Sequence, residues 1–180
     1  MERDDIELTV QGSIQTCRTN SSADLYCKFG FYYEGDWKII SGYCTSITQT
    51  CHIEGVKCAY INYPINISFK GENPFGWPQF IIAVYGFNHF GNDTCIGYGG
   101  IHIPTQAGHH VLDIPLFTTR STSLFDKCIQ FFTGLGPELF QTSVIAQNQG
   151  RETLFTSSGG SVRIELNVVL SDSSSLDLQL

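Results

Sequence analysis

The chain has 180 residues, of which 42% are apolar and only 15% charged, and its formal net charge is −7. A domain of this size buries roughly 70% of the surface its unfolded chain exposes, so it needs no disulfide or metal to fold. Ten Lys and Arg residues face seventeen Asp and Glu residues without a basic run. That balance argues against a nucleic-acid binder and against simple attraction to anionic lipid.

The start of the chain is acidic on balance, with Glu2, Asp4 and Asp5 beside Arg3, and no signal peptide or membrane-spanning apolar stretch is visible. The seven cysteines are an odd number, whereas secreted disulfide scaffolds usually carry an even one. We therefore expect a soluble intracellular protein with reduced thiols.

Alternating apolar and polar residues predict strands in the first half of the chain. The alternation runs from Ile6 to Ile14, from Leu25 to Tyr33 and from Ile65 to Phe69. Residues 80–85 are apolar at every position, which indicates a strand covered on both faces. Residues 41–60 are polar and rich in threonine, and their pattern favours no element.

Three further strands are expected in the second half. One runs from Ile96 to Ile103, with a bulge or bend at Gly99-Gly100, and another covers residues 110–116 and is closed by Pro115. In the last strand, four apolar residues point inward and alternate with outward polar ones: Val162, Ile164, Leu166 and Val168. Many short strands separated by turns predict an all-β antiparallel sandwich.

One short helix is expected at about 122–133, because apolar residues recur there at helical spacing: Leu124, Phe125, Cys128, Phe131 and Phe132. Gly134 and Pro137 would end it, and we expect it to lie across an open end or edge of the sandwich. The chain then divides into an N-terminal extension (1–5), one domain (6–170) and a flexible tail (171–180).

No catalytic motif is found, and no cofactor or metal site is expected. Gly97-Tyr98-Gly99-Gly100 lies within a strand pattern and opens no helix, so it is not a phosphate loop. Cys44, Cys51 and Cys58 recur at every seventh residue, whereas zinc sites use closely spaced pairs. Loop acids are isolated, which argues against calcium, because calcium needs about six to eight oxygen ligands.

The segment 73–79, Asn-Pro-Phe-Gly-Trp-Pro-Gln, is the most distinctive part of the chain. Each proline forces the preceding residue into an extended conformation, and Gly76 permits a backbone angle that other residues avoid. We expect a turn that feeds a strand, with Trp77 sealing one end of the sandwich.

Several segments occur together in an order that resembles the B9 domain family. They are 24–28, 64–70, 73–79, 84–86, 90–93, 97–99, 102–104, 114–117 and 149–152. The resemblance covers roughly residues 6–170 and excludes 41–60, which do not align. It implies a C2-like β-sandwich and a non-enzymatic component of the Meckel syndrome/tectonic complex. This complex lies at the transition zone and basal body of the cilium, where it supports ciliogenesis and controls entry of membrane proteins.

The resemblance also implies partners, namely other B9 proteins and transition-zone membrane proteins. Its signature residues are expected to be structural: Asn73, Pro74, Gly76, Trp77, Pro78, Gly91, Asn92, Gly97, Tyr98 and Gly99. Partner or membrane contacts are expected from Phe75, Phe87 and Phe90.

Two alternatives stay open at this point. One is a peripheral lipid-binding C2 domain that inserts such aromatic side chains. The other is a secreted adhesion domain glycosylated at Asn20, Asn66 or Asn92.

Overall fold

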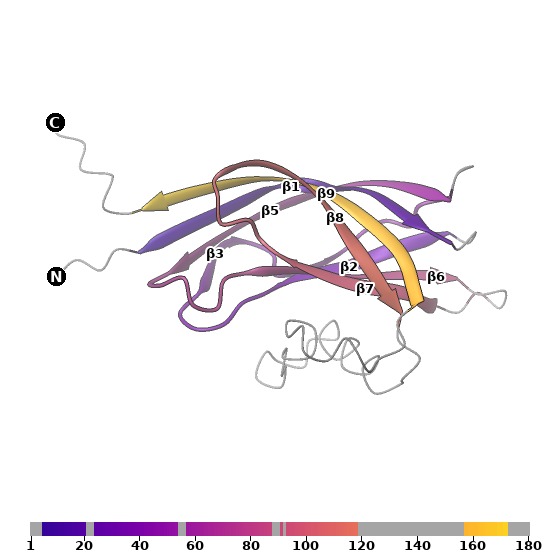
Figure 1. The fold of residues 1–180 in the computed structure, drawn as a ribbon, viewed down its shortest axis with the longest axis horizontal. Coiled ribbons are helices and arrows are strands. Elements are labelled where there is room, and N and C mark those ends of the chain that lie inside the picture. The colour runs from indigo at the N-terminus through magenta and orange to yellow at the C-terminus, as the bar shows by residue number, and fades with distance from the viewer. Residues whose placement is uncertain are drawn as a thin grey trace.

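The fold is that of a computed structural model, which describes residues 5–20, 24–53, 57–87, 91, 93–118 and 157–172 (Figure 1). These residues form nine strands: β1 (Ile6–Thr19), β2 (Leu25–Tyr32), β3 (Lys38–Gly42), β4 (Thr45–Ile47), β5 (Cys58–Gly71), β6 (Gln79–Phe87), β7 (Asp93–His102), β8 (Gly108–Thr118) and β9 (Ser157–Asp172). All pairings are antiparallel. The expectation of an all-β antiparallel fold is therefore confirmed.

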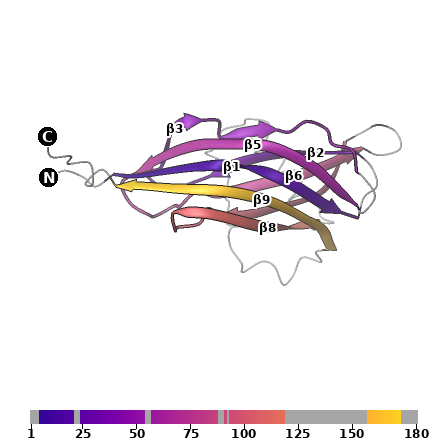
Figure 2. The same ribbon diagram turned by 90° about the horizontal axis from the view of Figure 1, so that it is seen from above.

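The strands make one sheet in the order β3-β5-β1-β9-β8-β7-β6-β2-β4. Figure 2 shows β5, β1, β9 and β8 side by side, and Figure 1 shows β2, β6 and β7 beneath β1, β5 and β9. The two groups of strands are connected where β7 pairs with β8, and the register there is a single pair, Tyr98 with Phe117. The sheet therefore folds back on itself here and encloses a core between two layers.

Aromatic side chains fill the space between the layers. The Phe31 ring of β2 lies 5.7 Å from the Phe69 ring of β5, and Phe29 lies 5.5 Å from Tyr63. β2 and β5 stand near opposite ends of the sheet order, so these contacts show that the outer parts of the sheet face each other. Burying such a ring stabilises the fold by about 1.5–3 kcal/mol.

The alternating patterns place the core correctly. In β9 the four apolar residues of the pattern are buried, and β2 buries its odd-numbered positions from Leu25 to Phe31. β6 is buried on both faces from Phe80 to Tyr85, as its continuous apolar run predicts.

Two details of the predicted strands are wrong. Pro115 does not close β8, which continues to Thr118, because Pro115 stays exposed and in register with Ser161 of β9. The irregularity in β7 lies before Gly99-Gly100. Val84 pairs with Gly97 and Tyr85 with Cys95, so the extra residue is Ile96.

The segment 41–60, which favoured no element, contains the end of β3, the whole of β4 and the start of β5. The helix expected at 122–133 lies outside the described residues. β1 begins at Ile6 and β9 ends at Asp172, and the division of the chain at 5 and 170 stays a prediction.

Candidate docking surfaces

The signature turn, defined as residues 73–79, connects β5 to β6 and is held by side chains as well as backbone. Asn73 Oδ1 accepts a hydrogen bond from the Phe75 N–H at 2.9 Å, and Asn73 Nδ2 donates to Asp36 at 2.8 Å. Gly76 has φ of 74°, and its carbonyl accepts the Glu34 N–H at 3.0 Å. A Cβ at Gly76 would lie 2.3 Å from the Glu34 carbonyl oxygen, so the turn requires glycine.

Two tryptophans fix this turn to the end of the sandwich. The Trp77 indole N–H donates to the Ile103 carbonyl at 2.8 Å, and the Trp37 indole N–H donates to the Phe75 carbonyl at 3.0 Å. The two ring centroids are 5.2 Å apart in an edge-to-face arrangement. Trp37 is 3% exposed and Trp77 is half-buried. The geometry thus makes the turn a rigid platform.

Trp37 was missed by the sequence analysis, although it is one of only two tryptophans in the chain and directly follows the turn Glu34-Gly35-Asp36. Asp36 and Lys38 on either side of it are polar and exposed, but the alternation stops at the adjacent Ile39 and Ile40, so no strand pattern marked Trp37 as buried. Its partner, the Phe75 backbone, is 38 residues away along the chain.

The other signature residues lie in β7 and directly before it in the chain. Gly97 and Gly99 are buried, and Tyr98 is half-buried opposite Ala83 of β6. Gly91 is exposed with φ of 77°, while Asn92 and Phe90 lie outside the described residues.

The two exposed phenylalanines predicted as contacts belong to different surfaces. Phe75 is 71% exposed on the signature turn, and Phe87 is 36% exposed at the far end of β6. Nine strand residues separate these positions by roughly 30 Å. Phe87 lies 6.0 Å from Tyr26, which stacks on Tyr85. Burial, together with a hydrogen bond to Asp93, raises the pKa of Tyr26 to about 12.

A surface that the sequence analysis did not find lies where the two ends of the sheet meet. We call it the seam and define it as residues 38–47, which contain β3 and β4. β3 is the first strand of the sheet order and β4 the last, and two residues join them. Three large apolar side chains of the seam are exposed: Ile40 by 56%, Tyr43 by 82% and Ile47 by 58%.

Backbone hydrogen bonds hold the seam and the residues after it against β2. The Phe31 N–H donates to the Cys44 carbonyl at 2.9 Å, and the Thr48 N–H donates to the Cys27 carbonyl at 2.9 Å. Leu25 and Cys51 exchange two bonds, of 3.0 and 2.7 Å. The exposed side chains of the seam therefore stand on ordered backbone.

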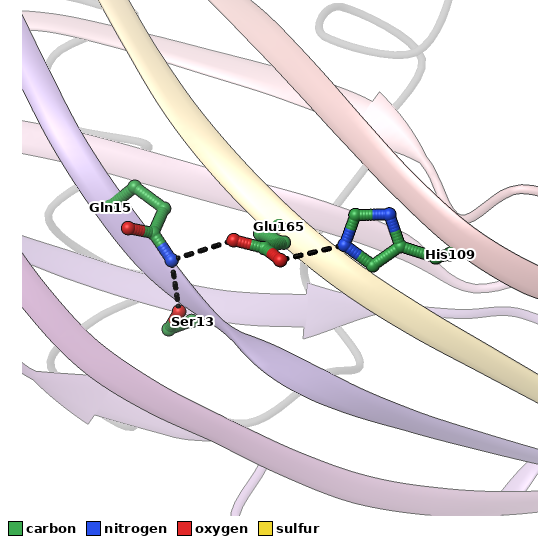
Figure 3. Close-up of polar contacts among 4 residues, drawn as sticks. All are labelled: Ser13, Gln15, His109 and Glu165. Atoms are coloured by element: carbon green, nitrogen blue, oxygen red, sulfur yellow. Dashed lines mark hydrogen bonds and ion pairs between the residues drawn. The ribbon is translucent and has the colours of Figure 1, made fainter.

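The outer face of β1, β9 and β8 carries a polar cluster, drawn in Figure 3. The Gln15 amide nitrogen donates to Ser13 at 2.8 Å and to Glu165 at 2.9 Å, while His109 Nε2 lies 2.6 Å from the other Glu165 oxygen. A serine nucleophile needs a base at hydrogen-bond distance, and here an amide donor occupies that place. The cluster ties three strands together and does not form a nucleophile–base pair.

The cysteines that the structure describes are free thiols, three of them buried: Cys17, Cys27 and Cys51. Burial raises the pKa of the Cys17 thiol to about 12 and that of Cys27 well above its usual range. Thiols in this state are protonated and weakly nucleophilic.

Among the described residues, no group of three or more His, Cys, Asp or Glu side chains could hold a metal ion. The same residues contain no helix long and apolar enough to cross a membrane.

The chain belongs to the B9-C2 family, described as "Ciliary basal body-associated, B9 protein", whose sequence model matches residues 8–169. This confirms the resemblance drawn from the sequence motifs.

Within that family, the chain is similar to two kinds of protein. It is 41% identical to B9 domain-containing protein 1 of Xenopus laevis, over 92% of this chain and 84% of that protein. The corresponding human protein is 40% identical over 92% of this chain and 82% of its own length. B9 domain-containing protein 2 of Bos taurus is 32% identical over 91% of this chain and 93% of its own length.

One similar solved structure is a C2 domain of plant extended synaptotagmin 1. Its TM-score is 0.39 at 14% sequence identity, covering 93% of this chain and 95% of that one. The strand pairings of the chain itself establish its fold.

Proposed function

We propose that this chain is a non-enzymatic scaffold of the ciliary transition zone and basal body, needed for ciliogenesis and for gating ciliary membrane proteins. Membership of a family described as ciliary basal body-associated supports this proposal. The partners we propose are other B9-domain proteins and transition-zone membrane proteins.

The structural feature that best supports a docking role is the exposed apolar surface of the seam. Strands at the edge of a sheet present backbone groups that can pair with another chain, and natural proteins usually protect such edges. Here the two edge strands are only five and three residues long, but the seam exposes Ile40 of β3, Tyr43 between the strands and Ile47 of β4. Aromatic and apolar side chains are enriched at the centre of protein interfaces, where they contribute most of the binding energy. We propose that a related B9 domain docks on the seam.

Replacing seam side chains tests this proposal. Tyr43→Ala and Ile47→Lys should leave the melting temperature unchanged, because both side chains are exposed. Each should weaken binding to purified B9 domain-containing protein 2 by about tenfold or more, measured by surface plasmon resonance.

Val111→Lys is the matched control. Val111 is 56% exposed in β8, close to the 58% of Ile47, but it lies on the outer face of the other layer. The control should bind as the unchanged protein does. Full binding by both seam variants, or equal losses in all three, would show that the seam is not the docking surface.

A further inference from the structure

Phe75 has an exposed side chain on an unusually well-held backbone. The ring is 71% exposed. The Phe75 N–H donates to Asn73 Oδ1 at 2.9 Å, and its carbonyl accepts the Trp37 indole N–H at 3.0 Å. The next residue, Gly76, accepts from the Glu34 N–H. An exposed aromatic ring on a fixed backbone loses little conformational freedom on binding, which favours a role as an interface anchor.

Acidic residues occur in the two chain segments next to this ring. Gly35 lies against Phe75, since a Cβ on Gly35 would be 3.3 Å from the Phe75 ring. The neighbours of Gly35 in the chain, Glu34 and Asp36, are both exposed acids, and Glu72 precedes the turn and is also exposed.

Two of these acids accept hydrogen bonds from uncharged donors. Glu34 accepts a hydrogen bond from the Tyr32 hydroxyl, and Asp36 accepts one from the Asn73 amide. Neither donor carries a charge, so neither of these hydrogen bonds pairs an acid with a cation. The nearby cations are Lys38, which is exposed, and Lys70, which is bound to Asp5 at 2.8 Å.

We propose that Phe75 forms a second docking surface together with its acidic rim, which we define as Glu34, Asp36 and Glu72. This surface binds a protein segment that carries Lys or Arg next to apolar side chains. This proposal builds on the scaffold function, because it gives the chain a partner surface separate from the seam. Opposite charges on the two partners raise the association rate and select the partner. The Phe75 ring, which becomes buried in the complex, supplies most of the affinity.

An anionic membrane does not fit the same surface. A C2-type domain that inserts an aromatic side chain into acidic lipid needs basic residues beside it, since anionic lipids attract Lys and Arg. In the segments next to Phe75 the exposed charges are mainly acidic, and an anionic lipid surface would repel these acidic side chains.

The experiment is a selection from a random twelve-residue peptide display library on the full-length folded protein. We expect the recovered peptides to combine Lys or Arg with adjacent apolar residues. Synthetic versions of them should bind Phe75→Ala about tenfold or more weakly, and their affinity for the unchanged protein should fall as salt is raised. The double variant Glu34→Lys/Asp36→Lys should bind them more weakly still or not at all.

Tyr43→Ala is the control, because it removes an exposed aromatic ring from the seam and should leave peptide binding intact. Circular dichroism and the melting temperature of each variant establish that it is folded. Peptides that bind Phe75→Ala as well as the unchanged protein, or that are not basic, would overturn the proposal. Binding to phosphatidylserine/phosphatidylcholine vesicles that Phe75→Ala abolishes would also overturn it, in favour of a membrane. If the peptides bind through Phe75 and the seam variants still bind the B9 partner, the second surface stands and the seam fails.

Discussion

Trp77 joins three parts of the chain through a single side chain. Its indole donates to the Ile103 carbonyl after β7 and packs edge-on against Trp37, which is itself bonded to the signature turn. We propose that its role is to close this end of the sandwich.

If this role is right, Trp77→Ala should lower the free energy of unfolding by about 3 kcal/mol, because it removes a large, partly buried ring and leaves a cavity. Trp77→Phe should cost less, because it keeps an aromatic ring and loses one hydrogen bond, worth about 1 kcal/mol. Urea unfolding of both variants measures the difference. A Trp77→Ala protein with an unchanged melting temperature and abolished partner binding would identify Trp77 as an interface anchor instead.

The buried thiol of Cys17 makes stability depend on alkaline pH. Burial raises its pKa in the folded protein from 9.0 to about 12. Above about pH 9 the unfolded chain therefore loses a proton that the folded protein keeps. The free energy of unfolding should be steady below that pH and then fall as pH rises toward about 12, by up to about 1.4 kcal/mol per pH unit.

Urea unfolding at about pH 8 and about pH 10.5 measures this loss. The buried thiol of Cys27 and the raised pKa of Tyr26 act in the same direction, so part of the loss should remain in a Cys17→Ala variant. The variant should nevertheless lose less stability than the unchanged protein. An identical fall in both proteins would contradict the assignment to Cys17.

At the scale of elements, the edge of β2 depends on Thr48, which follows β4. Thr48 is 6% exposed, and its hydroxyl accepts the Cys27 N–H at 2.9 Å and donates to the Gln49 carbonyl at 2.9 Å. Its own N–H donates to the Cys27 carbonyl. One threonine thus secures the segment that carries the seam.

Thr48→Val keeps the shape of the side chain but leaves the buried Cys27 N–H without that acceptor. The free energy of unfolding should fall by about 1–3 kcal/mol. Thr45→Val, at an exposed position in β4, should change it by less than about 0.5 kcal/mol. Chemical denaturation of the two variants side by side makes the comparison, and equal effects would mean that the Thr48 hydroxyl does not hold this edge.

The strands that could be predicted from the sequence are those with one face in the core. In β9, every second residue from Val162 to Val168 is buried, and this spacing appears in the sequence as alternating apolar and polar residues. β3 and β4 escaped prediction because they are five and three residues long and expose much of their apolar surface. Their positions depend on pairing with Phe69 and Phe29, which are distant along the chain.

The candidate surfaces could also be predicted only in part. The signature turn was visible because Asn73, Pro74 and Gly76 have local conformational consequences. The platform beneath it depends on Trp37, and the acidic rim depends on Glu34 and Asp36, which meet the turn only in the folded chain. The placement of a single residue beside a turn 38 positions away has no signature in local sequence.

At the scale of the whole molecule, the sheet closes on itself. Its first and last strands, β3 and β4, also follow one another in the chain. β3 and β4 are joined by Tyr43 and Cys44, and the aromatic contacts between β2 and β5 bring the two outer parts of the sheet together. This closure places both sheet edges in the seam, whereas the outer face of β1, β8 and β9 is largely polar. A scaffold built in this way offers one apolar edge to a partner and keeps its largely polar face in water.

Hydrogen exchange with and without a bound B9 domain tests the central claim that the seam is where such a domain docks. Backbone amides of β3 and β4 in the free protein should exchange faster than those of β1 and β9, because they stand at the sheet edges. Adding purified B9 domain-containing protein 2 should slow exchange across residues 38–47 and leave β8 unchanged. Binding without added protection in 38–47, or with protection confined to other strands, would contradict the account.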